Sequence, residues 1–485
     1  MKKLKMRLKK WNTNMKRFKY ISLCLSLFLG SATWAQEIEL PEKIDLAKAI
    51  ETAMTNNYDI KIARAEADKA QNSHHIGNAG LLPSVSASGG GDFSVNDTEI
   101  QFMNMGGGTG SGGSTGGGAG GGAAPDDTPT PGDIMVIDGA ESISYNASIR
   151  MDYTIFDGFG NVYTYKKLEG ASELQETLYR QQMEMTIVQV AEQYYEVCRA
   201  QQNYNLAQQS LDISKERYQK AVDQKTYGQA NQLDLLNAEV DMNSDSTLLL
   251  QTEQQLLMSL KNLNVVMGIG VNNSYEVNDS VTYRDDLTAD YVTTAAMTYN
   301  ASIVAQLQQT EISELDMKIT RARKMPSISA YGSYGYNRTD NEASQVIYNQ
   351  NRGFSTGLSA SFNIFNGRQQ RIAEQNAKID LATEKERQRQ TEAQIERDIA
   401  NAYTDYTYKK RIVELQRTSL KQARLNFEST KEMFALGRST SIEFRTAQEN
   451  LLNVANQFSD AQFQAKVSEF YLLQLSGLIL NDPAN

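Results

Sequence analysis

The sequence contains an internal duplication, and this feature limits the folds open to the chain more than any other. The repeated positions are FDG at 156–158 and FNG at 365–367, Gly228 and Gly437, and Gly268 and Gly477. Each recurrence lies 209 residues further along, so neither copy carries an insertion between these positions. Two copies with the same spacing are expected to share helix lengths and turn positions.

Upstream of these positions the offset between the copies is larger. The motif Leu-Pro-Ser at 82–84 matches Met-Pro-Ser at 325–327, an offset of 243. The extra 34 residues of the first copy fall between Pro83 and Phe156, where the chain reads MNMGGGTGSGGSTGGGAGGGAAPDDTPTP. A stretch of this composition buries no apolar surface and is expected to form a flexible loop. A phosphate-binding loop is the alternative, but the Lys-Ser/Thr pair that such a loop uses is absent from this stretch.

The N-terminus has the pattern of a secretory signal peptide over residues 1–35. A basic stretch ends near Lys19, an apolar run extends from Tyr20 to Gly30, and small residues flank a cleavage site after Ala35. Removal of 1–35 takes away nine of the 48 Lys and Arg residues and none of the 58 Asp and Glu residues, which leaves a formal net charge of −19. This acidic balance argues against nucleic-acid binding, which uses basic surfaces.

The residues that usually carry catalysis or bind metals are scarce. After the signal peptide only Cys198 remains, so no intrachain disulfide can form, and a small buried apolar role is expected for it. The only histidines, His74 and His75, are adjacent; if they lie on a helix they point about 100° apart and stay in solvent. No hydrolase, zinc-protease or nucleotide-binding motif is present. We expect no catalytic residue, no metal and no cofactor, and therefore no enzyme.

A second pattern, with a period of two residues, predicts β-strands. In 144–156 the odd positions are apolar and the even positions polar. The apolar set is Tyr145, Ala147, Ile149, Met151, Tyr153 and Ile155, and the polar set is Asn146, Ser148, Arg150, Asp152 and Thr154. The repeat partner, 354–365, alternates in the same phase, and weaker alternations follow Pro83 and Pro326.

The length of these strands, at least ten residues each, suits a tilted membrane-spanning strand, which needs about 9–11. A half-buried antiparallel sheet in a water-soluble protein is the alternative. Four strands cannot close a barrel, and an open sheet edge in lipid leaves backbone groups unpaired. If the strands lie in a membrane, several copies of the chain must therefore share one barrel, and Arg150 and Asp152 then face its lumen.

Long helical stretches follow each FxG motif, at about 161–226 and 369–436, and each would be roughly 100 Å long. Apolar residues recur in them every seven positions, at Val190, Val197, Tyr204, Leu211 and Tyr218, and at Ile399, Tyr406, Val413, Leu420 and Phe427. In the helices that follow the glycines the spacing alternates between four and three, and the first copy places Ala238, Met242, Asp245 and Leu249 in this seam. Such a 3.5-residue period indicates coiled-coil packing.

The two glycines between paired helices predict tight turns. Gly228 and Gly437 suit the left-handed position that ends a helix. Asn231 and Thr440 then cap the returning helices, and the acidic residues three positions later, Asp234 and Glu443, complete a capping box. Each copy is therefore expected to contain two strands, a long helix, a tight turn and a returning helix.

Taken together, these features resemble the TolC-type outer-membrane efflux proteins over nearly all of the mature chain. The resemblance implies a mainly α fold with a membrane β-barrel: three copies form a 12-stranded barrel and a 12-helix periplasmic coiled-coil tunnel. It also implies a passive exit duct in the outer membrane of a Gram-negative bacterium, as part of a tripartite efflux or type I secretion system. The implied partners are two further copies, a periplasmic adaptor protein, an inner-membrane pump of the RND, ABC or MFS type, and outer-membrane lipid.

The resemblance also implies roles for residues at the turns. Adaptor docking would fall on the turns themselves, at Tyr227, Gly228, Asn231, Leu436, Gly437 and Thr440. Acidic residues after the second glycine form a pore constriction in the family, and Glu443 matches the first of them, with Asp234 its counterpart in the first copy. The second family position is Thr446 here, so the sequence departs from a gate with two acidic rings. Capping alone is the other role open to Asp234 and Glu443.

These patterns divide the chain into eight expected segments. They are a signal peptide (1–35), periplasmic helices (36–82), a strand pair with the glycine-rich extracellular loop (83–157), a helical hairpin (158–268), a connector with periplasmic helices (269–325), a second strand pair (326–366), a second hairpin (367–477) and a tail (478–485). The alternative function is a trimeric coiled-coil surface adhesin or structural envelope protein. Adhesins carry one short C-terminal anchor, however, whereas here strand pairs recur 209 residues apart.

Overall fold

The structure is a computed structural model that describes residues 43–101, 134–228, 231–341 and 348–480. The predicted signal peptide and the glycine-rich stretch lie outside the described residues. The chain forms two compact units, and each contains segments from both halves of the sequence. The first unit comprises 1–61, 183–287 and 402–474, and the second comprises 62–182, 288–401 and 475–485.

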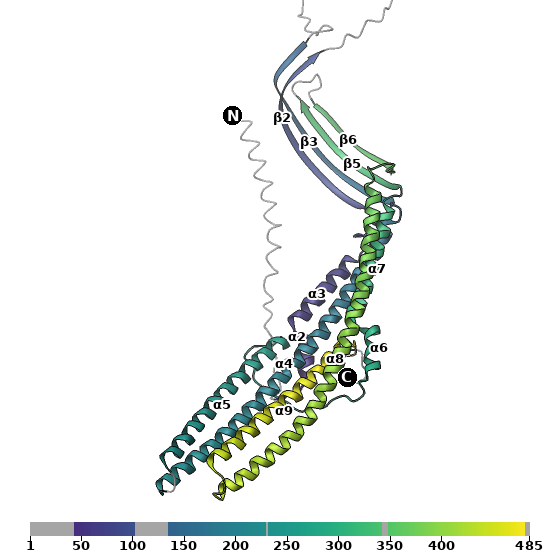
Figure 1. Cartoon of the computed structure of the whole chain (residues 1–485). Helices are drawn as coiled ribbons and strands as arrows, with labels where there is room; N and C mark the ends of the chain where they lie inside the picture. Colours follow the sequence, from purple (N-terminus) through teal and green to yellow (C-terminus); the bar gives the residue numbers. More distant parts are fainter. Residues whose placement is uncertain (1–42, 102–133, 229–230, 342–347, 481–485) are drawn as a thin grey trace, which may run out of the picture. The chain divides into compact units, whose positions relative to one another are not determined.

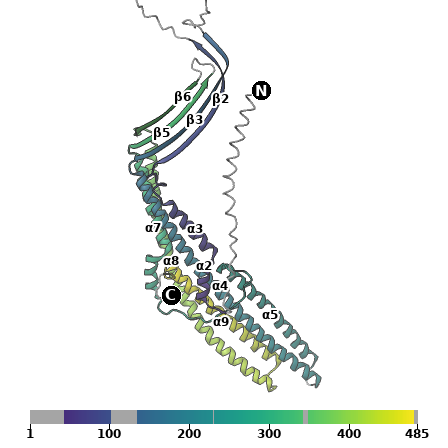
Figure 2. The same cartoon turned by 180° about the vertical axis from the view of Figure 1, so that it is seen from behind.

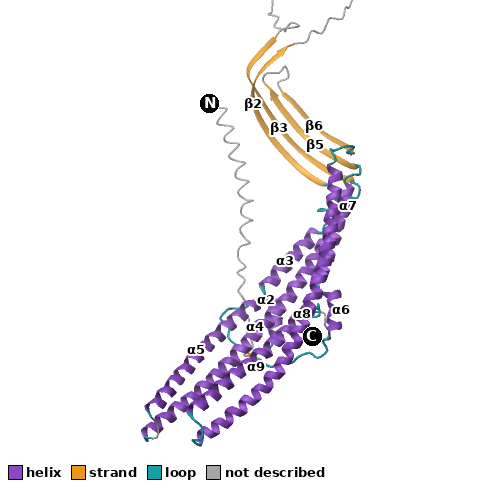
Figure 3. Ribbon diagram, viewed as in Figure 1, coloured by secondary structure: helices purple, strands orange, loops and turns teal. Residues whose placement is uncertain are grey.

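The second unit contains a four-stranded antiparallel sheet with the order β2-β3-β5-β6 (Figure 3). Its strands are β2 (Ser84–Gln101), β3 (Ile134–Phe156), β5 (Ser327–Asn341) and β6 (Tyr348–Ser361). The two strand pairs of the duplication thus meet along β3 and β5, where Ile149 lies opposite Tyr334. Among the described strands, β2 and β6 each have a neighbour on one side only.

The register of the sheet gathers the apolar sets of all four strands on one face. Ile149 lies opposite Ala87 on one side and Tyr334 on the other, and Tyr334 lies opposite Phe354. Most large side chains of this face are exposed, among them Val85, Phe93, Ile149, Tyr334, Phe354 and Leu358. The opposite face carries mainly Ser, Asn and Gly, with Arg150 and Asp152 among them. The predicted alternation is therefore confirmed, and the apolar face has no cover within the described part of the chain.

The long helices have equal lengths in the two copies, as the ungapped duplication requires. Helices α4 (Gly160–Thr226) and α8 (Gln369–Ala435) each contain 67 residues. The returning helices are α5 (Gln232–Met267) and α9 (Ser441–Leu475). Within the first unit the hairpins α4–α5 and α8–α9 lie side by side, with α4 and α9 in the middle (Figures 1 and 2). Seven of the ten residues of the predicted seven-residue pattern are buried, and the other three are half-buried.

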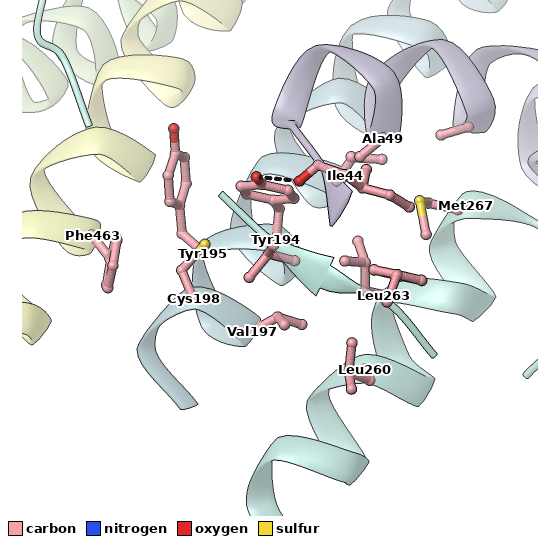
Figure 4. Packing of buried hydrophobic residues seen from close by; sticks show 14 residues of the cluster. Ile44, Ala49, Tyr194, Tyr195, Val197, Cys198, Leu260, Leu263, Met267 and Phe463 are labelled. Atoms are coloured by element: carbon pink, nitrogen blue, oxygen red, sulfur yellow. Dashed lines mark hydrogen bonds between the residues drawn. The ribbon is translucent and has the colours of Figure 1, made fainter. Parts of the chain in front are cut away.

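Shorter elements surround the ends of these hairpins. They are β1 (Lys43–Ile44), α2 (Leu46–Asn56), α3 (Tyr58–Ser73), β4 (Glu276–Val277), α6 (Ala289–Tyr299) and α7 (Ala301–Ala322). Strands β1 and β4 pair in parallel in the first unit. The Tyr194 hydroxyl lies 3.0 Å from the Ile44 carbonyl oxygen, in an apolar cluster drawn in Figure 4. Cys198 is fully buried in this cluster, as predicted, and burial raises the pKa of its thiol.

An asparagine contact occurs once in each copy, and sequence analysis did not identify it. Asn57 accepts hydrogen bonds at the start of α3 and donates to the Val266 carbonyl oxygen at 2.7 Å. Asn300, 243 residues later, caps α7 and donates to the Leu475 carbonyl oxygen at 2.8 Å. Each asparagine therefore joins the start of one helix to the end of a returning helix. The signal was present in the sequence, because AMTNN at 53–57 recurs as AMTYN at 296–300.

The expectation of two solvated histidines is confirmed for His75, which is exposed, but His74 is half-buried. Helix α3 ends at Ser73, so His74 and His75 follow the helix instead of lying on it. The His74 ring packs against Tyr165, with the ring centroids 4.6 Å apart. Across the described ranges, no group of His, Cys, Asp or Glu side chains could hold a metal ion. The helices of those ranges also contain none that is long and apolar enough to cross a membrane.

Candidate functional site

The two hairpin turns use their glycines for the left-handed conformation. Gly228 and Gly437 have φ values of 72° and 71°, and a Cβ atom at either would meet no other atom within 4 Å. The residue before each glycine is a large, strongly exposed side chain, Tyr227 at 79% and Leu436 at 70%. The turns thus present apolar side chains on an open backbone.

Each returning helix begins at a capping box. In the first copy the Asn231 side chain accepts from the Asp234 N–H at 2.8 Å, and Asp234 accepts from the Asn231 N–H at 3.4 Å. In the second copy Thr440 Oγ1 accepts from the Glu443 N–H at 3.2 Å, and Glu443 Oε2 accepts from the Thr440 N–H at 2.8 Å. Reciprocal bonds of this kind satisfy backbone donors that the first helical turn leaves unpaired.

The three residues proposed for the constriction all have exposed side chains. Glu443 Oε2 also accepts from the hydroxyls of Ser439 and Thr440. The backbone N–H of Thr440, together with these hydroxyls, lowers the pKa of Glu443, so its carboxylate is charged at neutral pH. Thr446 donates to the Ile442 carbonyl oxygen of its own helix at 2.9 Å. Capping and a role in a pore remain compatible for Asp234 and Glu443.

Arg150 and Asp152, predicted to face a lumen, form an ion pair on the polar face of the sheet. Arg150 Nε donates to Asp152 Oδ2 at 2.8 Å and Oδ1 at 3.0 Å. The Arg150 guanidinium also lies 5.0 Å from the centre of the Tyr331 ring on β5. The pair is thus held in place by the strand next to its own.

A buried ion pair joins the two hairpins near the start of α9, and the sequence patterns did not reveal it. Arg445 on α9 binds Asp245 on α5 through two hydrogen bonds, Nη1 to Oδ2 at 2.7 Å and Nη2 to Oδ1 at 3.0 Å. The Asp245 side chain is 3% exposed and that of Arg445 is 16% exposed. Such bidentate geometry is the strongest form of ion pair between side chains.

Helix α4 completes the surroundings of this carboxylate. The hydroxyls of Ser210 and Ser214 both donate to Asp245 Oδ2. Gln448 of α9 donates to Ser210 through its side-chain amide, to the hydroxyl at 2.8 Å and the carbonyl at 3.1 Å. Three helices of the two hairpins therefore converge on one buried charge.

A second arginine makes a similar link closer to the turns. Arg217 of α4 donates through Nη2 to Asp241 of α5 at 3.0 Å and to Ser441, the first residue of α9, at 2.8 Å. Its guanidinium lies 5.7 Å from the centre of the buried Phe444 ring. Phe444 in turn stacks on Phe434 of α8, with the centroids 4.9 Å apart. We call Arg217, Asp241, Asp245, Ser441 and Arg445 the interhairpin network.

The electrostatics of this network favour the charged forms. Burial by itself raises the pKa of Asp245, but the hydrogen bonds from Arg445 and Ser214 outweigh burial and lower it. The network ties α4, α5 and α9 to one another. A sequence signal existed, because Asp245 occupies a seam position where a buried apolar residue is usual.

The lowered pKa of Asp245 predicts how the link depends on pH. A group with a lowered folded pKa contributes its full stability above its unfolded pKa, about 3.9, and loses it as pH falls through the folded value. We therefore expect the melting temperatures of wild type and Asp245→Asn to differ at pH 7 and to converge as pH falls below the unfolded pKa of the carboxyl group. Thermal unfolding between pH 2.5 and 8 measures this, and a constant difference across the range would contradict it.

Comparison with known protein families identifies the family to which a chain with these turns and this sheet belongs. The family described as outer membrane efflux protein matches residues 49–269 and 293–478. The chain belongs to the outer membrane efflux protein family. A comparison with curated proteins found no match.

Solved structures show the same fold for this efflux protein. The CmeC outer membrane channel of Campylobacter jejuni is 17% identical with a TM-score of 0.69, and the match covers 90% of this chain and 86% of that one. The outer membrane protein VceC of Vibrio cholerae is 15% identical with a TM-score of 0.66, covering 89% and 96%. The open-state MtrE channel of Neisseria gonorrhoeae is 14% identical with a TM-score of 0.66, covering 90% and 89%.

The family membership establishes the class of function. This efflux protein is an outer membrane channel of tripartite efflux systems in Gram-negative bacteria, with a periplasmic helical part, and it is not an enzyme. The predicted fold class and resemblance are confirmed. Between the two functions left open by the sequence, the efflux channel is correct and the adhesin is not.

Proposed function

We propose that three copies of this chain assemble into one passive exit duct, which receives substrates from an inner-membrane pump through a periplasmic adaptor. The observation that carries the proposal is the sheet, because β2 and β6 lack a second neighbour among the described strands and one face is apolar and exposed. Open edges in lipid are unstable. Pairing β6 of one copy with β2 of the next removes every edge and closes twelve strands.

Closure of the sheet into a barrel determines which face of the sheet meets lipid and which lines the lumen. The apolar face then meets lipid, and the polar face with Arg150 and Asp152 lines the lumen, as in other membrane barrels. Molecular-mass measurement of the detergent-solubilised protein tests the assembly. A mass of three chains plus detergent supports the proposal, and a stable monomer that conducts ions would contradict it.

The hairpin turns are the proposed docking site for the adaptor. Tyr227 and Leu436 are among the most exposed large apolar side chains of the chain, and each is followed by a glycine with free space around it. Docked protein would cover these side chains and approach the backbone at the glycines closely. The caps at Asn231 and Thr440 fix the turns in shape.

Arginine in place of either turn glycine is expected to abolish efflux without preventing assembly. The long side chain would fill the space over the turn, whereas the left-handed backbone costs only about 1–2 kcal/mol. Retention of a fluorescent dye by cells measures efflux for Gly228→Arg and Gly437→Arg. Gly437→Ala is the matched control, because it has the same backbone strain without the bulk. Normal efflux in the arginine variants, or equal loss in the alanine variant, would contradict docking at this site.

The closed state of the duct is proposed to depend on the interhairpin network. Arg217 and Arg445 hold the first turns of α9 against α4 and α5. Glu443 lies between Ser441 and Arg445 on the same helix, so release of α9 would also move Glu443. Opening the periplasmic end of the duct then requires breaking the hydrogen bonds of Arg217 and Arg445, and the docked partners supply the energy.

Loss of charge at Glu443 tests its proposed place in the constriction. Glu443→Gln keeps an acceptor for the capping box, so the helix start is retained while the charge is lost. We expect the cation-to-anion permeability ratio to fall about twofold or more, as for rings of acidic side chains in cation channels. Reversal potentials across a KCl gradient measure the ratio, and Asp234→Asn is the equivalent change in the first copy. An unchanged ratio for Glu443→Gln leaves Glu443 a capping residue only.

A further inference from the structure

On β5 and β6 the apolar face of the sheet ends, on the side away from the helices, at a cluster that carries arginine. On β6 and the residues after it, exposed apolar side chains run from Phe354 to Ile364. Ten residues span about 33 Å along a strand, or about 25 Å at a tilt near 40°, which is the height of the apolar band of outer-membrane barrels. Helix α8 begins at Gln369, just past the Ile364 end. Because the helical part is periplasmic, the Phe354 end faces the outer leaflet.

Two arginines lie just beyond the Phe354 end on the same face. Arg352 is opposite Tyr336, and Arg338 is opposite Gln350, two residues before Arg352 on β6. The arginines are therefore diagonal neighbours on adjacent strands, with backbone positions about 7–8 Å apart, within reach of one ligand. Both side chains share a face with Tyr334 and Phe354 because they alternate in phase with them.

The bonds within this cluster leave it with net positive charge. Arg338 pairs with Asp340 at 3.0 Å, and its guanidinium lies 5.4 Å from the centre of the Tyr348 ring. Arg352 is exposed and forms no ion pair with any residue that the structure describes. On the strands beside it, Ala147 lies opposite Tyr336 and Gly89 opposite Ala147, whereas Tyr145 lies opposite Arg338. We call Tyr336, Arg338, Tyr348 and Arg352 the rim cluster.

The position of the rim cluster in the membrane indicates which class of ligand it can bind. Arginine on a lipid-facing surface is costly in the middle of a bilayer and tolerated at its interface. Tyrosine rings prefer the level of the headgroups, where one end of the ring is wet. Guanidinium groups bind phosphate through paired, charge-assisted hydrogen bonds. The ligand must therefore be a lipid whose phosphates lie at the outer interface.

We propose that the rim cluster binds the phosphorylated headgroup of an outer-leaflet glycolipid, the diphosphorylated glucosamine lipid of Gram-negative outer membranes. Arg352, which forms no ion pair with a described residue, supplies a guanidinium for one phosphate, and Arg338 lies on the other side of the same headgroup. The tyrosines flank the sugar. This contact sets the depth of the sheet in the membrane, and it rests on the outer-membrane location of the protein and not on conduction through it.

Native mass spectrometry of the full-length detergent-solubilised protein tests the site. The probe is diphosphoryl lipid A, compared with its dephosphorylated form and with phosphatidylglycerol. We expect Arg338→Gln/Arg352→Gln to weaken binding of the diphosphorylated lipid by about tenfold or more, from the loss of charge-assisted hydrogen bonds. Arg150→Gln removes an arginine from the opposite face of the same sheet and is the matched control, with unchanged lipid binding expected.

A second variant keeps the test valid if the double variant fails to assemble. Arg352→Gln breaks no ion pair with described residues, so it should fold as wild type and still bind the lipid about threefold or more weakly. Unchanged affinity in Arg352→Gln and in the double variant would overturn the proposal. Equal binding of the dephosphorylated lipid would also overturn it. Equal binding of phosphatidylglycerol would show a general anionic surface instead of a glycolipid site.

Discussion

Replacing Asp245 by leucine is expected to lower the free energy of unfolding by up to about 3–5 kcal/mol, because the largely buried Arg445 loses its bidentate partner and keeps the exposed Glu449, 2.8 Å away, as its close ion-pair partner. The loss should be concentrated at the first turns of α9, since Arg445 is the α9 residue that Asp245 binds. Chemical denaturation of the detergent-solubilised protein measures the total loss in the free energy of unfolding. Amide hydrogen exchange shows which helices lose protection.

The double variant separates the ion pair from the packing around it. Asp245→Leu/Arg445→Leu removes both charges and should be less destabilised than Asp245→Leu alone, because no buried charge is left without its bidentate partner. Glu386→Ala is the control, since its ion pair with Arg389 is exposed and worth under about 1 kcal/mol. Additive losses in the double variant would mean that Asp245 and Arg445 do not act as a pair.

Gly477→Ala is expected to destabilise the fold by several kcal/mol and to reduce the assembled protein in the membrane. Gly477 has φ 68°, and a Cβ there would lie 2.5 Å from the Tyr299 carbonyl oxygen. No contact that close is tolerated, so the end of α9 must move away from the start of α7 and stretch the Asn300 bond to Leu475. Gly268→Ala should behave alike, because its Cβ would lie 2.4 Å from the Asn56 carbonyl oxygen.

The turn glycine of the same copy provides the comparison for this prediction. Gly437 has nearly the same φ, 71°, but nothing lies within 4 Å of the position of a Cβ. Gly437→Ala should therefore cost only the backbone strain, about 1–2 kcal/mol. Denaturation midpoints and the yield of membrane-assembled protein measure both variants. If Gly477→Ala and Gly437→Ala were equally destabilised, the close approach at Gly477 would have no energetic role.

Periodicity and duplication were sufficient to predict most of the fold. The period of two in 144–156 identifies which side chains share a face of β3, and a one-residue slip would have moved all of them. The common offset of 209 predicts that the long helices match, and α4 and α8 have the same length. These features are local or repeated, so the amino-acid pattern alone carries them.

The interhairpin network was not predictable by the same means. Asp245 and Arg445 are 200 residues apart, and their pairing depends on which helix faces which after packing. On its own helix Asp245 is a charged residue at a seam position where an apolar residue is expected. Its ion pair with Arg445 of α9 explains why a charge is present there. The Asn57 and Asn300 contacts join residues 209 and 175 positions apart, so they too depend on how the helices pack.

The predicted site residues differ in how much of their proposed role a single chain shows. The turn residues and caps are in place, with Gly228 and Gly437 in the left-handed conformation and Asp234 and Glu443 bonded to their N-caps. Whether those carboxylates line a pore depends on the positions of other copies, which a single chain does not contain. Their role in conduction therefore stays a prediction.

The most direct test of the duct and its network is the conductance of the purified protein in planar bilayers, with no pump, adaptor or nucleotide present. Wild type should give small, infrequent openings if, as proposed, the Asp245–Arg445 ion pair keeps the periplasmic end of the duct closed. Asp245→Lys places a cation against Arg445 and should give steady ohmic currents several times larger. The absence of any current in both proteins would contradict a passive duct. Equal currents in both would contradict a gate that the interhairpin network holds closed.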